Sequence, residues 1–516
     1  MQKEINKLIA LFLFSMVMGC NPVPGNFKQS DESPELYPDY TSLTIPYNIA
    51  PLNFQILNKG EQFVVEISNS LNRRITISST KGRISFPKES WKKLLNEDRG
   101  GALTISVYKK NRGGPWEALM PVRNEISGDR IDPYIAFRKI APANINWGEM
   151  GIYQRSLESF KETPIMVNSI SDKNCMNCHT FNARNPEQML FHMRGPYGGT
   201  MIADSENIQF VDTKIEQTRS AGAYASWHPG GELVAFSVNK ISQSFHSRIG
   251  KISNVADKYS DIVLYDVKRN SITRPAELAT AKLENLPSWS TDGRCLYYIC
   301  ADRSIDSLPY DSRVYKLMSI SFDVETRKFG SMDTLISVSD FGRSISHPRE
   351  APMKDFISFI GLDYGYFSIN NPESDVYFYN KKTGEITLPG INSDLTESYP
   401  SWSSDGSWLM FVSKREDGIF SQVWFSHIDE NGIAAKPFVM PQKNPDFYED
   451  YLFNYNRPEF ISGKVKWNPK KLFAIARNGA ESSSFNEASS VSISSGATVM
   501  ASPDDGDGGD EHYNHD

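Results

Sequence analysis

Two cysteines and a histidine at the spacing C-x-x-C-H are the residues of this sequence best suited to chemistry. Cys175 and Cys178 are three residues apart, and His179 follows directly. Two thiols at this spacing match the two vinyl groups on one edge of a haem and form thioethers with them, and the next histidine then ligates the iron. The motif therefore predicts one covalent haem c held by Cys175, Cys178 and His179.

Three other chemistries compete for the same thiols. A thioredoxin-like redox pair requires a neighbouring βαβ unit, for which we find no pattern. A zinc site requires two further ligands, and a structural disulfide or free thiol pair is the remaining alternative. Cys295 and Cys300 are the other thiols outside the signal region, and five residues along a strand places them on opposite faces. They are thus expected neither to bridge each other nor to complete a zinc site.

The second axial ligand of the iron is sought downstream of the motif. If Gln188–Gly195 is helical, Met189, His192 and Met193 share one face. His192 is the only histidine between His179 and Trp227, so we expect it to close the iron from the far side. Met189 or Met193, or an open site, are the alternatives.

A haem also carries carboxylates that need partners. Arg184 and Arg194 lie in the same stretch of chain, and either guanidinium could pair with a haem propionate. The methionines nearby have a simpler interpretation as apolar packing around the porphyrin.

The first twenty residues read as an export signal. Lys3 and Lys7 precede an apolar run, Leu8–Gly19, which is too short to span a bilayer. The run ends at Cys20 in a sequence that resembles the bacterial lipobox, which implies cleavage before Cys20 and acylation of that residue. An ordinary signal peptide is the alternative. We therefore expect residues 1–19 to be a signal peptide and the protein to lie in the cell envelope, lipid-anchored and either periplasmic or associated with the outer membrane.

Composition limits the remaining possibilities. A chain of 516 residues is expected to form at least two domains. The net charge of -7 is mixed along the chain without a basic block, which argues against a nucleic-acid partner. The Pro-rich stretch 20–42 is expected to be a flexible tether, and the Ser-, Gly- and Asp-rich stretch 479–516 a disordered acidic tail.

Short alternating segments between residues 43 and 143 predict a β-sandwich domain. One helical turn or two is expected at Trp91. Residues 144–206 are expected to form a separate bridge and haem segment between this domain and the repeats that follow.

A repeat occupies residues 207–478. The pattern P-x-W-S-x-D-G or a close variant recurs around Trp227, Trp289 and Trp402, with a worn copy at Ser346-His347-Pro348, at spacings of 62, 57 and 56 residues. A tight hairpin and an outer hairpin per period form a four-stranded blade. We expect the tryptophan to pack between blades and the Asp-Gly to make a turn. The fold class is thus mainly β, with a propeller of five or six blades, and residues 207–211 are expected to add a strand to the last blade.

The repeat resembles that of TolB-like propellers. The stretches 43–54, 147–164 and 175–200, taken with the repeat, are similar to TolB-like lipoproteins with a haem motif from Bacteroidetes-type bacteria. The resemblance covers about residues 40–480. It implies a histidine at the position of His192, whereas the next residue varies, and it implies no particular reaction.

These features favour a membrane-anchored c-type cytochrome whose propeller docks a redox partner or an envelope protein, for electron transfer or redox relay. The alternative is a TolB-like binding or scaffold protein in which the haem is structural or sensory. A hydrolase is a third possibility, because propellers also precede peptidase domains, but the sequence contains no G-x-S-x-G elbow. We expect no catalytic residue.

Overall fold

The computed structural model describes residues 23–141, 149–205, 207–248, 251–303, 313–487 and 490. The signal peptide, Cys20 and most of the acidic tail lie outside these residues. The chain divides into two compact units. The first contains residues 1–130, 158–160 and 441–451, and the second contains the rest.

The first unit is built from two sheets and one helix. The larger sheet contains seven strands: β1 (Phe27–Gln29), β3 (Thr44–Pro46), β5 (Gln62–Asn69), β6 (Arg74–Ser79), β8 (Ala102–Lys110), β9 (Trp116–Ala118) and β10 (Val122–Ser127). The smaller contains β2 (Leu36–Tyr37), β4 (Phe54–Ile56) and β7 (Arg83–Ile84). Val65 and Val107 of the larger sheet and Phe54 and Ile84 of the smaller are fully buried. The predicted β-sandwich is therefore confirmed.

Trp91 explains the helix of this unit. It lies in α2 (Lys88–Asn96) with Leu94 and Leu95 on the buried face. Its ring stacks on Phe86 at 5.4 Å, and its indole N–H donates to the Ile49 carbonyl at 3.0 Å. The helical turn expected at Trp91 is thus present.

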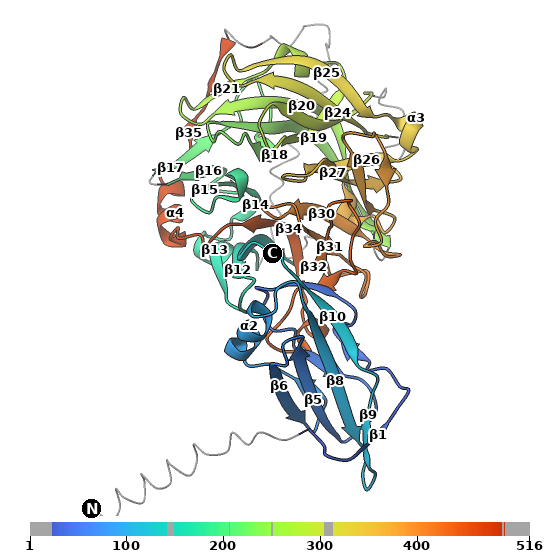
Figure 1. Ribbon diagram of the computed structural model, residues 1–516. Helices are drawn as coiled ribbons and strands as arrows, with labels where there is room; N and C mark the ends of the chain where they lie inside the picture. The colour runs from blue at the N-terminus through green and yellow to red at the C-terminus, as the bar shows by residue number, and fades with distance from the viewer. Residues whose placement is uncertain are drawn as a thin grey trace, which may run out of the picture. The chain divides into compact units, whose positions relative to one another are not determined.

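The second unit consists of six sheets of four paired core strands each, counted over the described residues (Figure 1). We number them in ring order. The first contains β14 (Cys175–Phe181), β15 (Gln188–Arg194), β16 (Gly199–Asp204) and β17 (Asn207–Asp212). The second contains β18 (Gly222–Trp227), β19 (Leu233–Arg248), β20 (Lys251–Asp266) and β21 (Ser271–Thr273). The third contains β22 (Leu283–Trp289), β23 (Cys295–Ala301), β24 (Lys316–Asp323) and β25 (Lys328–Ile336).

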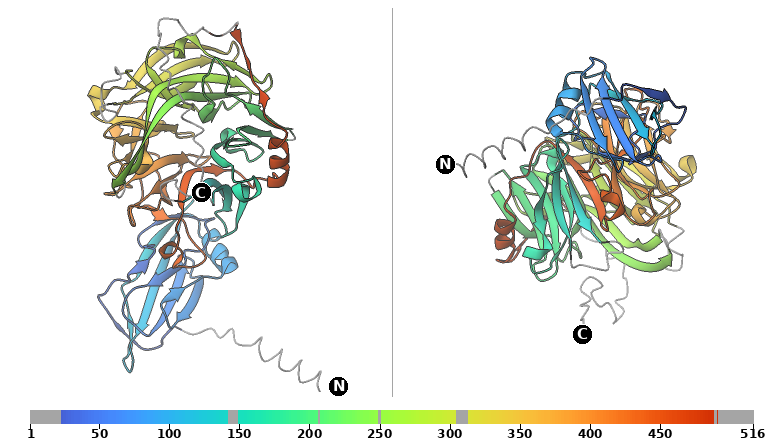
Figure 2. Two further views of the ribbon diagram at one scale, coloured as in Figure 1. Left: turned by 180° about the vertical axis from the view of Figure 1, so that it is seen from behind. Right: turned by 90° about the horizontal axis from the view of Figure 1, so that it is seen from below.

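The remaining three sheets complete the series, which Figure 2 shows from two further sides. The fourth contains β26 (Ser344–Glu350), β27 (Phe356–Leu362), β28 (Asp375–Asn380) and β29 (Ile386–Thr387). The fifth contains β30 (Glu397–Trp402), β31 (Trp408–Ser413), β32 (Gln422–His427) and β33 (Phe438–Val439). The sixth contains β34 (Asn454–Ile461), β11 (Tyr134–Ile140), β12 (Gly151–Ser156) and β13 (Glu162–Val167).

The sixth sheet closes the ring with strands from both ends of the repeat region. Its inner strand β34 contacts β30 of the fifth sheet and β14 of the first, and β11–β13 come from before the C-x-x-C-H motif. The expectation that residues 207–211 serve the last blade is wrong, because β17 pairs with β16 at the outer edge of the first sheet. The propeller has six blades, within the predicted range.

Short additions extend two blades. β35 (Glu481–Ser482) pairs in parallel with β17, and β36 (Ser484–Phe485) with β21. Two helices also belong to this unit, α3 (Val338–Phe341) and α4 (Pro469–Ala476), and the latter buries Leu472 and Ala476. No helix in the described part of the chain is long and apolar enough to cross a membrane.

The structure divides the chain differently from the expected domain boundaries. The stretch expected as a tether contains β1 and β2, and Tyr40 within it is fully buried. The compact unit that contains the propeller begins at Ile131. Residues 151–204, expected as a bridge and haem segment before the propeller, instead form strands of the sixth and first sheets. These strands bury both faces, and they lack the tryptophan and Asp-Gly marks that reveal the other blades.

The roles assigned to the repeat residues are confirmed. Trp227 packs among residues of the first and second sheets, and Trp289 among residues of the second and third. Asp292 and Asp405 each accept from a serine hydroxyl and a backbone N–H in their turns. The glycines that follow have φ angles near +70°, which a residue without Cβ adopts most readily.

Candidate haem-binding site

The C-x-x-C-H motif lies on the innermost strand of the first sheet. Cys175 begins β14, and His179 lies two residues before its end at Phe181. Across β15, Asn177 pairs with His192 and Thr180 with Leu190, so Cys178 and His179 together lie opposite the single residue Phe191. The motif therefore contains a β-bulge, and Cys178 takes a φ of +51° there.

The same bulge recurs on the inner strand of every sheet of the ring. Each inner strand shifts register against its neighbour. One non-glycine residue at each shift has a positive φ: Cys178 (51°), Tyr224 (49°), Leu286 (50°), His347 (48°), Tyr399 (53°) and Arg457 (45°). Repetition of a strained conformation in six places indicates a framework feature rather than a local accident.

This alignment makes the haem motif a copy of the propeller repeat. Cys178-His179-Thr180-Phe181 corresponds to Tyr399-Pro400-Ser401-Trp402. The sequence alone did not reveal the match, because the proline, serine and tryptophan are all replaced. The one feature that could have revealed the match is the aromatic residue Phe181, which stands at the tryptophan position of the repeat.

The alignment also corrects the worn copy. Ser346 was expected to stand at the tryptophan position, but its register matches Asn285, and Glu350 matches Trp289. The tryptophan positions of the four central sheets, Trp227, Trp289, Glu350 and Trp402, are thus 62, 61 and 52 residues apart.

His179 is buried and forms no hydrogen bond of standard geometry in the described part of the chain. Its side chain is 3% exposed, and the Ala136 backbone of the sixth sheet lies close to its ring. Burial, reinforced by Arg457 and Arg138 and opposed by the Ala136 backbone, lowers the pKa of His179 to about 3. The imidazole is therefore neutral at physiological pH, which is the form that ligates iron.

His192 is held in a fixed orientation. Its Nδ1 lies 2.8 Å from the Thr200 hydroxyl, whereas its Nε2 is buried without a partner. Burial lowers the pKa of His192 to about 3. One anchored nitrogen and one available nitrogen is the usual arrangement of a metal-binding histidine.

The two imidazoles lie on opposite faces of the first sheet. His192 shares its face with Leu190 and packs near Phe236 of the second sheet, with ring centroids 5.7 Å apart. His179 lies across the bulge from Phe191, on the face that packs against the sixth sheet. The structure thus places both predicted ligands on neighbouring strands but does not bring them to one face.

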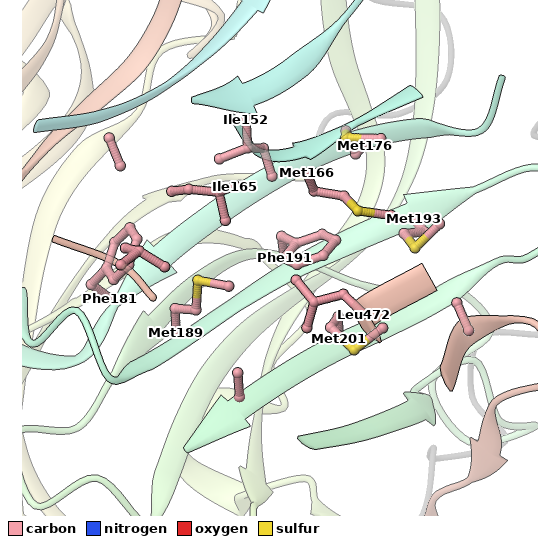
Figure 3. Packing of buried hydrophobic residues seen from close by; sticks show 14 of the residues in the cluster. Ile152, Ile165, Met166, Met176, Phe181, Met189, Phe191, Met193, Met201 and Leu472 are labelled. Atoms are coloured by element: carbon pink, nitrogen blue, oxygen red, sulfur yellow. The ribbon is translucent and has the colours of Figure 1, made fainter. Parts of the chain in front are cut away.

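The predicted helix around His192 is wrong. Residues 188–194 form β15, in which Met189, Phe191 and Met193 share one face and His192 the other. Every residue from Gln188 to Met193 is buried, so the polarity pattern that distinguishes a strand from a helix is missing. Met189 and Met193 pack with Met176, Met201 and other apolar residues between the first and sixth sheets (Figure 3).

Both cysteines of the motif are free thiols. Cys175 is buried beside Ile140 and Met150, and Cys178 is partly buried at the bulge. Burial raises the pKa of the Cys175 thiol, with Arg138 and Arg194 opposing the shift. A disulfide between them is not formed.

The arginines expected near a haem propionate have different surroundings. Arg184 donates from Nε to the Trp402 carbonyl at 2.8 Å, and its backbone carbonyl accepts from Ser462. Arg184 therefore ties the first sheet to the fifth. Arg194 is exposed at the end of β15.

The zinc alternative gains no support from the described residues. They contain no group of three or more histidine, cysteine and acidic side chains arranged to hold a metal ion. Cys295 packs against one apolar cluster and Cys300 belongs to another, which confirms that they face opposite ways. A haem iron needs at most two ligands from the protein, so its requirement is smaller than that of zinc.

No family model and no curated protein match the sequence. Similar solved structures include an oligogalacturonate lyase in complex with manganese, with 12% identity, a TM-score of 0.33, and coverage of 60% of this chain and 73% of that one. Another is the β-propeller domain of Cps50 (Swd1) from Myceliophteria thermophila, with 10% identity, a TM-score of 0.30, and coverage of 73% and 98%. A third is prolyl oligopeptidase B from Galerina marginata, with 9% identity, a TM-score of 0.32, and coverage of 81% and 54%. At this similarity none of them bears on function, and the propeller assignment rests on the strand pairing.

Proposed function

We propose that the protein is an exported, lipid-anchored c-type cytochrome of the TolB-like propeller type, which transfers electrons in the cell envelope. The observation that carries the proposal is the C-x-x-C-H motif, whose histidine is buried and neutral and, among the described residues, forms no hydrogen bond of standard geometry. A buried imidazole without a well-formed hydrogen bond costs free energy, so a ligand for it is expected.

The residues fit a covalent haem by donor type. Cys175 and Cys178 supply two unbridged thiols, and His179 supplies an imidazole that needs no deprotonation before it binds iron. A haem held there would take up and release one electron at a time. Both Cys178, which has a positive φ, and His179 lie in the β-bulge, a feature that changes the direction of side chains relative to a regular strand.

The surroundings favour a low-dielectric site. The His179 face of the first sheet meets an apolar cluster that contains Phe181, Phe191 and Met176. Such a lining would exclude water from a bound macrocycle. It would also keep the imidazole neutral.

His192 remains the predicted second ligand. Its Thr200 contact supports a ligand role, whereas its position on the opposite face favours a structural one. Replacing His192 with Ala distinguishes a ligand role from a structural one. A haem spectrum that changes from low-spin to high-spin in the variant, or a raised midpoint potential of the haem, supports ligation. An unchanged spectrum assigns the second position to another group, and a sulfur–iron charge-transfer band in the unmodified protein points to Met189 or Met193.

Anchoring through Cys20 is a separate part of the proposal. Replacing Cys20 with Ser should move the protein from the membrane fraction to the soluble fraction. Membrane retention of the variant would contradict lipidation.

The test of the proposed function is reversible reduction. Protein made with a cytochrome c maturation system should show a c-type pyridine haemochrome and be reduced and reoxidised by small mediators without loss of the spectrum. A haem that is present but cannot be reduced reversibly would favour the alternative, a TolB-like scaffold with a structural or sensory haem.

A further inference from the structure

The bulge residues of the ring meet around one cationic side chain, Arg457. Its guanidinium lies 5.8 Å from the centroid of the Tyr224 ring, which belongs to the second sheet. Its charge also acts on His179 of the first sheet, His347 of the fourth and Tyr399 of the fifth. A side chain of the sixth sheet that contacts the second sheet and whose charge acts on the first, fourth and fifth is placed close to the axis of the propeller.

Two further arginines accompany it. Arg138 follows Phe137 on β11 and pairs with Asn456, the residue before Arg457. Arg349 lies two residues beyond His347, and burial together with the Arg457 charge lowers its pKa to about 10. Arg138 and Arg457 act on the same two groups, His179 and Tyr399, and Arg457 also acts on Arg349, so the three guanidinium groups lie in one region of the propeller.

One nearby carboxylate, that of Glu459, cannot neutralise three guanidinium groups. Its charge acts on the pKa of Arg349, and the charge of Arg457 acts in turn on the pKa of Glu459. Its two carboxylate oxygens accept from the Thr180 hydroxyl at 2.8 Å and the Phe181 N–H at 3.0 Å. In the described part of the chain, neither Arg349 nor Arg457 forms an ion pair with it.

Donors of the cluster are left without acceptors. The Nη1 of Arg457 and the Nε of Arg138 are buried and have no hydrogen-bond partner among the described residues. Within the described part of the chain, the Arg349 guanidinium donates only to the neighbouring Pro348 carbonyl, at 2.8 Å. Buried guanidinium donors of this kind are normally satisfied by a carboxylate or phosphate oxygen.

We propose that Arg138, Arg349 and Arg457 form a carboxylate-binding site on the axis of the propeller, with Arg457 as its central residue. The site uses none of the thiols. A free carboxylate could occupy it whether or not a haem is attached, whereas a propionate as occupant rests on the proposed function. Two sources supply the same chemistry: a propionate of a haem attached at Cys178, or a free small carboxylate that enters the propeller.

Thermal unfolding distinguishes the sources. The unmodified chain is produced with and without a cytochrome c maturation system, and each form is melted in increasing succinate, with chloride replaced to hold ionic strength constant. Variants Arg457→Gln and Arg457→Lys test the site. Arg123→Gln, an exposed arginine of the first unit, is the matched control.

A saturable rise of the melting temperature in the haem-free form, absent in Arg457→Gln and kept in Arg123→Gln, supports the site. If the haem-bearing form does not respond and Arg457→Gln lowers its midpoint potential, a propionate is the occupant, because loss of the cation leaves a negative charge beside the iron. A response in both forms identifies a free carboxylate. No response in either form, with an unchanged potential in Arg457→Gln, overturns the proposal. If no haem can be attached, the melting temperatures of the haem-free protein in succinate still decide whether the carboxylate-binding site exists.

Discussion

The first and fifth sheets of the propeller share one backbone and carry different chemistry. Both inner strands break register at the same place and adopt a positive φ, at Cys178 in one and Tyr399 in the other. In the fifth sheet the next residues are Pro400, Ser401 and Trp402, which serve packing and contacts between sheets. In the first sheet the residue with the positive φ is a thiol, Cys178, and the residue after it is an imidazole, His179.

Two histidines make the same point. His228 of the second sheet accepts from the Gly230 N–H at 3.0 Å and bonds the Gly293 carbonyl at 3.1 Å, so both ring nitrogens have structural partners. Among the described residues, His179 forms no hydrogen bond of standard geometry. In this propeller, a histidine whose ring nitrogens lack good hydrogen bonds is therefore a better candidate for a functional residue than one whose nitrogens bond the backbone.

The most severe test converts the motif back into a repeat. The double variant Cys178→Tyr, His179→Pro places in the first sheet the residues found at Tyr399 and Pro400. We expect complete loss of covalent haem, measured by pyridine haemochrome, with a cooperative unfolding transition retained. An aggregated or unfolded variant would show that the two strands are not equivalent.

The hydrogen bonds between Glu459 of the sixth sheet and the first sheet should contribute more to the free energy of unfolding than the hydrogen bond between Ser226 of the second sheet and Trp289 of the third. Glu459→Ala removes acceptors for the Thr180 hydroxyl and the buried Phe181 N–H, so we expect a loss of about 3 kcal/mol in the free energy of unfolding. Ser226→Ala removes the hydroxyl that accepts from the backbone N–H of Trp289 and should cost about 1 kcal/mol. Equal losses in urea denaturation would contradict a special role for ring closure.

Substitution of Glu284, a buried carboxylate in the third sheet, tests whether a shifted pKa by itself identifies a functional residue. Burial raises the pKa of Glu284 to about 7, although Thr280 donates to it. The folded state therefore binds more protons than the unfolded state between pH 4.5 and about 7, and stability falls as the pH rises through that window. Glu284→Gln should stabilise the protein by about 3 kcal/mol at pH 8 and change little below pH 4.5, without affecting haem content. A pH-independent effect would place its cause elsewhere.

The repeat, the sandwich and the C-x-x-C-H motif could be read from the sequence because each has a local mark. The spacing between Trp289 and the Asp292-Gly293 turn predicts a propeller blade, and the residues around Trp91 predict a helical turn. The first and sixth sheets could not be predicted from the sequence. In the first, His179 and Thr180 replace the proline and serine of the repeat. In the sixth, β34 pairs with β11 from more than 300 residues away. Arg457 escaped notice for the same reason, since its position on the axis depends on ring closure.

The most direct test of the account is the intact mass of the full chain after export with a cytochrome c maturation system, followed by peptide mapping. The account predicts one haem on the peptide that contains Cys175, Cys178 and His179, and no reaction of either thiol with an alkylating reagent. Two alkylated thiols without haem, or a zinc ion in place of iron, would contradict it.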